Sequence, residues 1–376
     1  MEKGASQNVV VLCSGFGLGF YIPGLLISEK LRRLGITTEI EVFESLLPEN
    51  KIDMVERNRQ AYHANFKVAI ASQKVPGNSG ESLNHSALES LLAGWRHRDC
   101  RNFICLSGHW VTVLDRYREL RPDQTIRADL LYLDADLTAS WRQLQKLRAD
   151  YAKPYREVRP YDNVRVNYSV GVNAEEPLSY IERNNRMVVH GGGWGIGTFQ
   201  ERVSDLERAG CELDIVCYAK PENVSSSNGH RFYMDDPTWR TWHRNSQGEH
   251  TFPPFGEITA GSQSASFAQQ SNFHGLYRII RDARGIVSKP GAGTLIDSFA
   301  SATPLIMLEP FGPAEKRNAD VWEASGFGVQ YPAWATAGYP ISMLEELHCN
   351  IMQKRNEVKD YAQDYAQTLL MKDADE

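Results

Sequence analysis

One stretch in the last third of the chain constrains the fold more than any other, residues 284–328, RGIVSKPGAGTLIDSFASATPLIMLEPFGPAEKRNADVWEASGFG. It predicts a strand ending at Val287, a glycine turn, a helix with apolar residues at helical spacing, a buried strand at 304–308, a polar loop and another helix. Apolar strands that alternate with helices indicate a parallel sheet covered by helices on both faces. The stretch therefore predicts an α/β fold.

The glycine turn, 288–294, has the composition of a phosphate-binding site. Its glycines let backbone N–H groups come close to a ligand, and Thr294 opens a helix whose positive dipole end faces the same place. Asp297 follows one turn into that helix, where its carboxylate would reach a ribose hydroxyl. The polar loop after the second strand would then meet a sugar.

A second glycine turn supports this interpretation. The apolar strand 186–190 is followed by GGGWGIGT, residues 191–198. Three adjacent glycines favour a close approach of the backbone to a ligand, although tight packing of a helix on a strand is the structural alternative. Further along, Phe255 is a candidate to offer a nucleobase its ring or its backbone. The polar segment 220–246 is either an insertion or a lid.

The N-terminal segment also reads as a strand–helix–strand unit: strand 8–13, glycine loop 14–19, helix 23–34 and strand 38–43. A GxGxG loop followed by an acid after the second strand, here Glu44, is typical of dinucleotide binding. The loop disfavours NAD because its neighbours are bulky. We interpret it as an acceptor-binding loop whose candidate contacts are Gly17, Phe20 and Tyr21.

Polar residues follow two further predicted strands of this half. Strand 102–107 leads into His109, and strand 130–136 ends in the two acids Asp134 and Asp136. Ligands gather at the carboxyl ends of strands in open parallel sheets, so these residues are candidates for chemistry. Each has a structural alternative, because His109 would also fill a polar gap and Asp136 would also cap a helix.

Composition excludes several classes of function. The chain has 376 residues, a net charge of −6 and no basic tail, which argues against nucleic acid as a partner. No apolar run approaches the roughly 20 residues that span a bilayer, so no integral membrane association is expected. The start lacks a signal-peptide segment and the six cysteines form no CxxC pair, so we expect a cytoplasmic protein with reduced thiols and no metal cluster.

The motifs of the second half resemble those of the GT-B glycosyltransferases, in particular the group of the bacterial peptidoglycan N-acetylglucosaminyltransferase and the monogalactosyldiacylglycerol synthases. The matching residues, with Lys for the usual Arg and Asp for the usual Glu, are Ser288, Lys289, Gly291, Gly293, Thr294, Asp297, Pro304, Asn318 and Ala319. The resemblance covers most of residues 186–328 and is weaker over 1–172.

This resemblance implies two Rossmann-like domains that face each other across a cleft. We expect an acceptor-binding domain at 1–178, a nucleotide-sugar-binding domain at 179–340, and a helical segment at 341–376 that returns toward the first domain. The residues implied in donor binding are Gly192, Gly193, Trp194, Phe255, Ser288, Gly291, Ala292, Gly293, Thr294, Asp297, Glu315 and Lys316. The resemblance further implies an inverting, metal-independent transfer, with no cofactor beyond the donor.

One departure concerns the base. The family commonly carries a histidine three residues before the proline of the first loop, and this chain has Phe20 there. His109 is the first candidate to replace it, Asp136 the second and Glu44 the third. If His109 is the base, His109→Ala is expected to lower turnover by about 10²-fold or more.

The sequence thus predicts a transferase that uses a UDP- or dTDP-sugar and a small-molecule acceptor. A small acceptor is favoured because no basic, apolar membrane-docking helix lies near the start. Two alternatives stay open: a sugar-nucleotide 2-epimerase with the same fold, and a non-catalytic partner that binds nucleotide sugar. A homodimer also stays open.

Overall fold

The first domain is built on a parallel sheet with strand order β2-β1-β3-β4-β5. The computed structural model describes residues 8–73, 83–162, 165–220, 229–258 and 266–374. The strands are β1 (Asn8–Cys13), β2 (Thr37–Val42), β3 (Asn102–Cys105), β4 (Arg127–Leu131) and β5 (Arg156–Val158). Residues 9–13 are fully buried, as expected of an apolar strand with helices on both faces.

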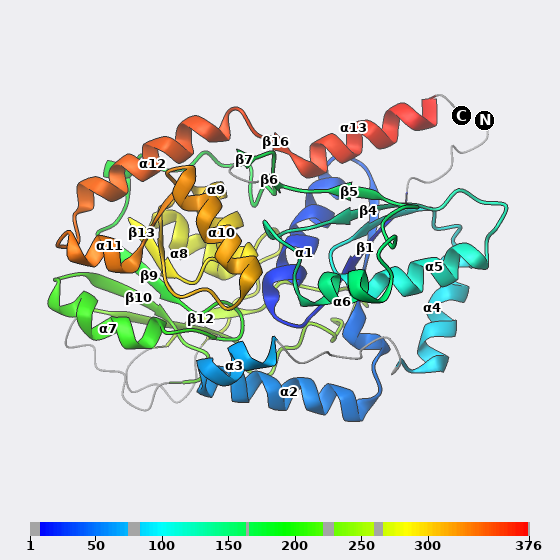
Figure 1. Cartoon of the computed structure of the whole chain (residues 1–376), viewed down its shortest axis with the longest axis horizontal. Coiled ribbons are helices and arrows are strands. Elements are labelled where there is room, and N and C mark those ends of the chain that lie inside the picture. The colour runs from blue at the N-terminus through cyan, green and yellow to red at the C-terminus, as the bar shows by residue number, and fades with distance from the viewer. Residues whose placement is uncertain (1–7, 74–82, 163–164, 221–228, 259–265, 375–376) are drawn as a thin grey trace.

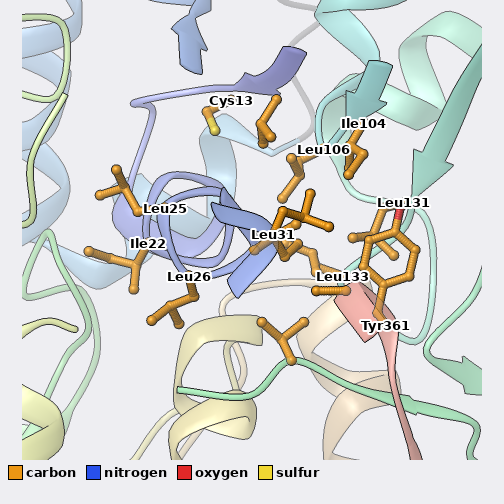
Figure 2. Close-up of a cluster of buried hydrophobic side chains, with 14 of the residues drawn as sticks. Cys13, Ile22, Leu25, Leu26, Leu31, Ile104, Leu106, Leu131, Leu133 and Tyr361 are labelled. Atoms are coloured by element: carbon orange, nitrogen blue, oxygen red, sulfur yellow. The ribbon is translucent and has the colours of Figure 1, made fainter. Parts of the chain in front are cut away.

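Helices flank this sheet: α1 (Leu18–Arg33), α2 (Glu49–Ala64), α3 (Phe66–Ser72), α4 (His85–His97), α5 (Val111–Glu119) and α6 (Ala139–Leu147). Helix α1 starts five residues before the predicted Pro23, so Phe20 and Tyr21 lie on a helix and not in a loop. Figure 2 shows the buried face of α1, where Ile22, Leu25 and Leu26 join side chains of the sheet and of the C-terminal helix.

The second domain has a larger sheet with the order β12-β11-β10-β9-β13-β14-β15, in which β12 runs antiparallel to β11. Its strands are β9 (Arg186–His190), β10 (Glu212–Val216), β11 (Arg231–Asp235), β12 (Phe255–Ile258), β13 (Gly285–Ser288), β14 (Leu305–Met307) and β15 (Gly328–Gln330). Its helices are α7 (Phe199–Arg208), α8 (Gly275–Asp282), α9 (Ala292–Ser301), α10 (Pro313–Ala324) and α11 (Tyr331–Thr336).

The two domains are joined by more than one passage of the chain (Figure 1). Strand β8 (Tyr168–Ser169) pairs with β16 (Lys359–Asp360) beside the linker. The hairpin of β6 (Tyr161–Asp162) and β7 (Arg165–Val166) packs in the core of the second domain. Helix α12 (Ile341–Arg355) stays on the second domain, whereas α13 (Tyr361–Ala374) returns to the first, where Tyr361 is fully buried (Figure 2).

Residues 236–254, here called the crossing segment, form another tie between the domains. They leave β11 and reach the first domain, where the Tyr21 hydroxyl donates to the Thr251 carbonyl at 2.9 Å. Arg240 pairs with Glu56 at 2.9 Å and Arg244 with Glu41 at 2.8 Å. Of the segment predicted as an insertion or lid, 220–246, residues 231–235 form β11 of the second sheet, and residues 236–246 belong to the crossing segment, which contacts the first domain.

Candidate functional site

A cavity of about 810 Å³ lies where the carboxyl ends of the two sheets face each other, and residues of both domains line it. This is the position at which ligands bind in open parallel α/β sheets. Within the described ranges, no cluster of three or more His, Cys, Asp or Glu side chains has metal-binding geometry. In the described part of the chain, no helix combines the length and apolarity needed to cross a membrane.

Both glycine turns of the second domain open onto this cavity. Gly191, Gly192, Gly193 and Trp194 line it after β9, and Gly291, Ala292, Gly293 and Thr294 line it at the start of α9. Lys289 lies between the turns, because its Nζ is 3.8 Å from a Cβ built on Gly192 and 3.2 Å from one built on Gly291. The Lys289 ammonium also forms an ion pair with Glu315. Backbone donors and one cation therefore meet at one place, which suits a diphosphate.

His190 ends β9 beneath the first turn, and sequence reasoning missed it. Its Nδ1 accepts a hydrogen bond from the Gly192 N–H at 3.1 Å, so a neutral ring carries its proton on Nε2. Burial, with Lys289 and His274 nearby, lowers the pKa of His190 to about 3, which keeps the ring neutral. This Nε2–H is buried without an acceptor among the described residues. An acceptor oxygen of a ligand would satisfy it.

Asp297 lies where the sequence predicts, one turn into α9 and at the cavity wall. His274, which was not predicted, approaches it with Nε2 at 3.0 Å from Oδ2. Burial raises the pKa of Asp297 well above its usual range and lowers the pKa of His274 to about 4. Burial therefore disfavours the charged form of both groups, and the hydrogen bond between them fixes the position of the Asp297 carboxyl. Phe255 lines the same end of the cavity and stacks on Tyr233 with ring centroids 5.5 Å apart.

Asp134 extends from the end of β4 to the second domain's side of the cavity. Its Oδ1 accepts a hydrogen bond from Asn318 Nδ2 at 2.7 Å, and no described residue donates to its Oδ2. Burial raises the pKa of Asp134 to about 7, with Glu315 and Asp136 adding to the effect and Asn318 and Lys289 opposing it. A carboxylate with this pKa is suited to take a proton near neutral pH.

The other predicted bases have different environments. His109 lines the cavity and stacks on Phe43 at 5.0 Å, and burial lowers its pKa to about 4, which makes it a weak base. Asp136 is not among the described residues that line the cavity, and it pairs with Arg142 at 2.7 Å. Glu44 lines the cavity and accepts from the Ser14 hydroxyl at 2.8 Å and the Gly15 N–H at 2.6 Å. Burial raises the pKa of Glu44.

The remaining predicted residues divide into two groups. Gly17, Phe20 and Glu315 line the cavity. Tyr21, Ser288 and Lys316 are not among its described lining residues. Tyr21 is buried in the core because α1 begins early, and Lys316 lies on the exposed face of α10, where it pairs with Asp320 at 2.9 Å.

The sequence prediction did not include Asp235, His190 or His274 as site residues, and it did not rank Asp134 among the candidate bases. Asp235 ends β11, lies opposite Phe255 in the ladder and lines the cavity. Burial raises its pKa to about 7, against the effect of Arg59. Asp235 and His190 could have been predicted from the sequence, because each is the last residue of a strand. His274 could not have been predicted in this way, because only the fold brings it to Asp297.

Comparison of the sequence with protein-family models and with curated proteins gives no match. Comparison of the structure with solved structures does give matches. The glycosyltransferase SsfS6 of Streptomyces sp. SF2575 is similar over 96% of this chain and 99% of its own, at 14% identity and a TM-score of 0.53. MurG of Acinetobacter baumannii is similar over 97% and 99%, at 11% identity and a TM-score of 0.53. SsfS6 in complex with thymidine diphosphate is similar over 97% of this chain and 99% of its own, at 11% identity and a TM-score of 0.50. The architecture that the resemblance implied is confirmed: the chain has the GT-B fold, with two Rossmann-like domains across a cleft.

Proposed function

We propose that this protein is a glycosyltransferase that moves a sugar from a nucleotide diphosphate sugar, of the UDP or dTDP type, to a small-molecule acceptor. The observation that carries the proposal is the convergence of both glycine turns and Lys289 on one cavity that continues into the first domain. The thymidine diphosphate in the SsfS6 complex supports a nucleotide donor for this fold.

On the donor side, the turn amides, the N-terminus of α9, Lys289 and the Nε2–H of His190 hold the diphosphate. Asp297, held by His274, forms hydrogen bonds with the ribose hydroxyls, and Phe255 contacts the nucleobase. These groups stabilise the negative charge of the leaving diphosphate, and in this proposal no metal is needed for it.

On the acceptor side, the lining is mostly apolar, which fits a small hydroxylated molecule with an apolar body. Described residues of this kind from the first domain are Phe16, Leu18, Phe20, Ile22, Phe43, Leu47, Met54, Val55 and Leu137. Asp134 lies among polar partners at the boundary with the donor side.

The proposed reaction is a single displacement. The acceptor oxygen forms a bond to the anomeric carbon while the bond from that carbon to the diphosphate oxygen breaks, and the electron pair goes to the diphosphate. Oδ2 of Asp134 takes the acceptor proton. Attack from the face opposite the leaving group inverts the configuration at the anomeric carbon.

The test combines binding and product analysis. UDP and dTDP are titrated by calorimetry, and UDP- and dTDP-sugars are then incubated with a panel of hydroxylated apolar acceptors. We expect one nucleotide to bind and one sugar to be transferred with inversion. Absence of binding by any nucleoside diphosphate ends the proposal. Turnover without an acceptor indicates an epimerase, and binding without turnover across the panel indicates a non-catalytic partner.

His190 gives a prediction on the donor side. His190→Phe removes the buried Nε2–H but keeps the ring volume, so nucleoside diphosphate affinity should fall by about 10-fold, the equivalent of one hydrogen bond to a charged oxygen. His190→Gln places an amide donor near the same point and should recover part of the affinity. Calorimetry measures both, and equal affinity of His190→Phe and wild type contradicts the assignment.

A further inference from the structure

Asn318 of α10 makes three hydrogen bonds at the site, two of which cross from the second domain to the first. Its Nδ2 donates to Oδ1 of Asp134 at 2.7 Å and to the Pro290 carbonyl at 2.9 Å, and its Oδ1 accepts from the Ala135 N–H at 2.7 Å. The side chain is fully buried. The amide orientation is fixed by chemistry, because the Ala135 N–H can only donate and the Pro290 carbonyl can only accept.

These bonds connect two functional parts. Pro290 belongs to the glycine turn that faces the diphosphate site, between Lys289 and Gly291. Asp134 and Ala135 belong to the first domain, at the end of β4. The carbonyl of the turn and the carboxylate of Asp134 therefore accept from the same amide group, so a shift of one is passed to the other through direct hydrogen bonds.

We infer that Asn318 is a positioning residue that couples the donor-binding turn to Asp134 and assigns proton transfer to Oδ2 of that carboxylate. The inference rests on the proposed function, in which Asp134 is the base. Since Oδ1 is committed to the Asn318 N–H, a proton on Asp134 resides on Oδ2. Donor binding thus sets the geometry of the base before the acceptor reacts.

The charged groups around Asp134 fix the direction of the expected effect. Glu315 of α10 and Asp136 of its own loop raise the pKa of Asp134, Lys289 lowers it, and the Tyr161 hydroxyl of the hairpin lies close enough to interact. Asn318 lowers the pKa of Asp134 because it donates a hydrogen bond to the charged form. Loss of this donor must therefore raise the pKa.

The experiment is the pH profile of kcat in Asn318→Ala and Asn318→Ser at saturating donor. The acid limb should move to higher pH by about one unit, with turnover at pH 7 lowered several-fold and largely recovered at pH 9. Nucleoside diphosphate affinity should change less than turnover does. Asp320→Asn, on the exposed part of the same helix, is the matched control and should retain the wild-type profile.

An acid limb that stays at the wild-type pH overturns the inference, and so does a loss confined to donor affinity. Transfer by the wild type is measured first, so a chain without transfer at any pH refutes the proposed function and not this coupling alone.

Hydrogen exchange of the wild type tests the coupling even if the variants do not fold. Nucleoside diphosphate should increase protection of residues 131–137 as well as 288–294. Protection confined to the two glycine turns contradicts the coupling.

Discussion

Asp134→Asn is expected to lower turnover by about 10²–10⁴-fold while nucleoside diphosphate still binds. The substitution keeps the shape of the side chain and leaves an oxygen to accept from Asn318, so it removes the base without removing the interdomain contact. Single-turnover rates and calorimetry on the same preparation measure the two quantities. His109→Phe and Asp136→Asn are measured in parallel, and a larger loss of turnover in either one contradicts the assignment of Asp134 as the base.

The same carboxylate gives the protein a predicted pH dependence. Because burial raises the pKa of Asp134 to about 7, turnover should fall as the pH drops below about 7 and the base becomes protonated. The stability of the folded protein changes with pH in the opposite direction to the turnover. The folded state binds this proton more tightly than the unfolded state, so the folded protein loses stability as pH rises from about 4 to about 7.

Asp134→Asn should therefore raise the melting temperature at pH 8 and change it little at about pH 2–3, where the carboxyl is protonated in both states. The expected rise is about 1–2 °C per kcal/mol of burial cost removed, because a chain of 376 residues has an unfolding entropy of about 0.8 kcal/mol/K. A variant that is inactive and also less stable at pH 8 would show that Asp134 is charged and favourably paired in the folded protein.

Lys289→Met is expected to weaken nucleoside diphosphate binding by about 10²-fold or more. The ammonium lies between the two glycine turns, where it would contact both ends of a diphosphate, and it pairs with Glu315. Its loss removes a charge-assisted contact and also leaves a buried carboxylate without its cation. Calorimetry measures affinity, and thermal unfolding measures the second effect.

A double variant separates these two effects. Lys289→Met combined with Glu315→Gln removes the unpaired carboxylate, so it should regain stability and not affinity. Lys289→Arg keeps the charge and should bind within about 10-fold of wild type. Recovery of full affinity in the double variant would mean that Lys289 acts only by neutralising Glu315.

The sequence predicted those parts of the structure that depend on local pattern. The strands predicted to end at Val287 and His190 have apolar residues on both faces and are followed by the glycine turns; in the structure they end at Ser288 and His190. The position of Asp297 one turn into a helix also follows from counting residues. These signals lie within a few residues of each other, so no tertiary contact is needed to read them.

The errors arise where side-chain direction depends on a distant partner. Tyr21 was assigned to an acceptor loop, yet helix α1 begins at Leu18 and turns the ring into the core, where its hydroxyl reaches Thr251. Asp136 lies two positions after Asp134 in the loop that follows β4, and only Asp134 reaches Asn318, whereas Asp136 pairs with Arg142. His274 and Asp297 are 23 positions apart, and only the docking of α8 on α9 joins them.

The crossing segment has a consequence for the catalytic cycle. Arg240, Arg244 and Thr251 fasten the second domain to the first on the side of α1 and α2, while α13 fastens it on another. Under the proposed function, domains that are already joined in this way lose little freedom when substrates bind, because their relative position is set by these contacts. Release of the nucleoside diphosphate product then requires these interdomain contacts to break. Product release, and not the transfer step, is therefore expected to limit the steady-state rate.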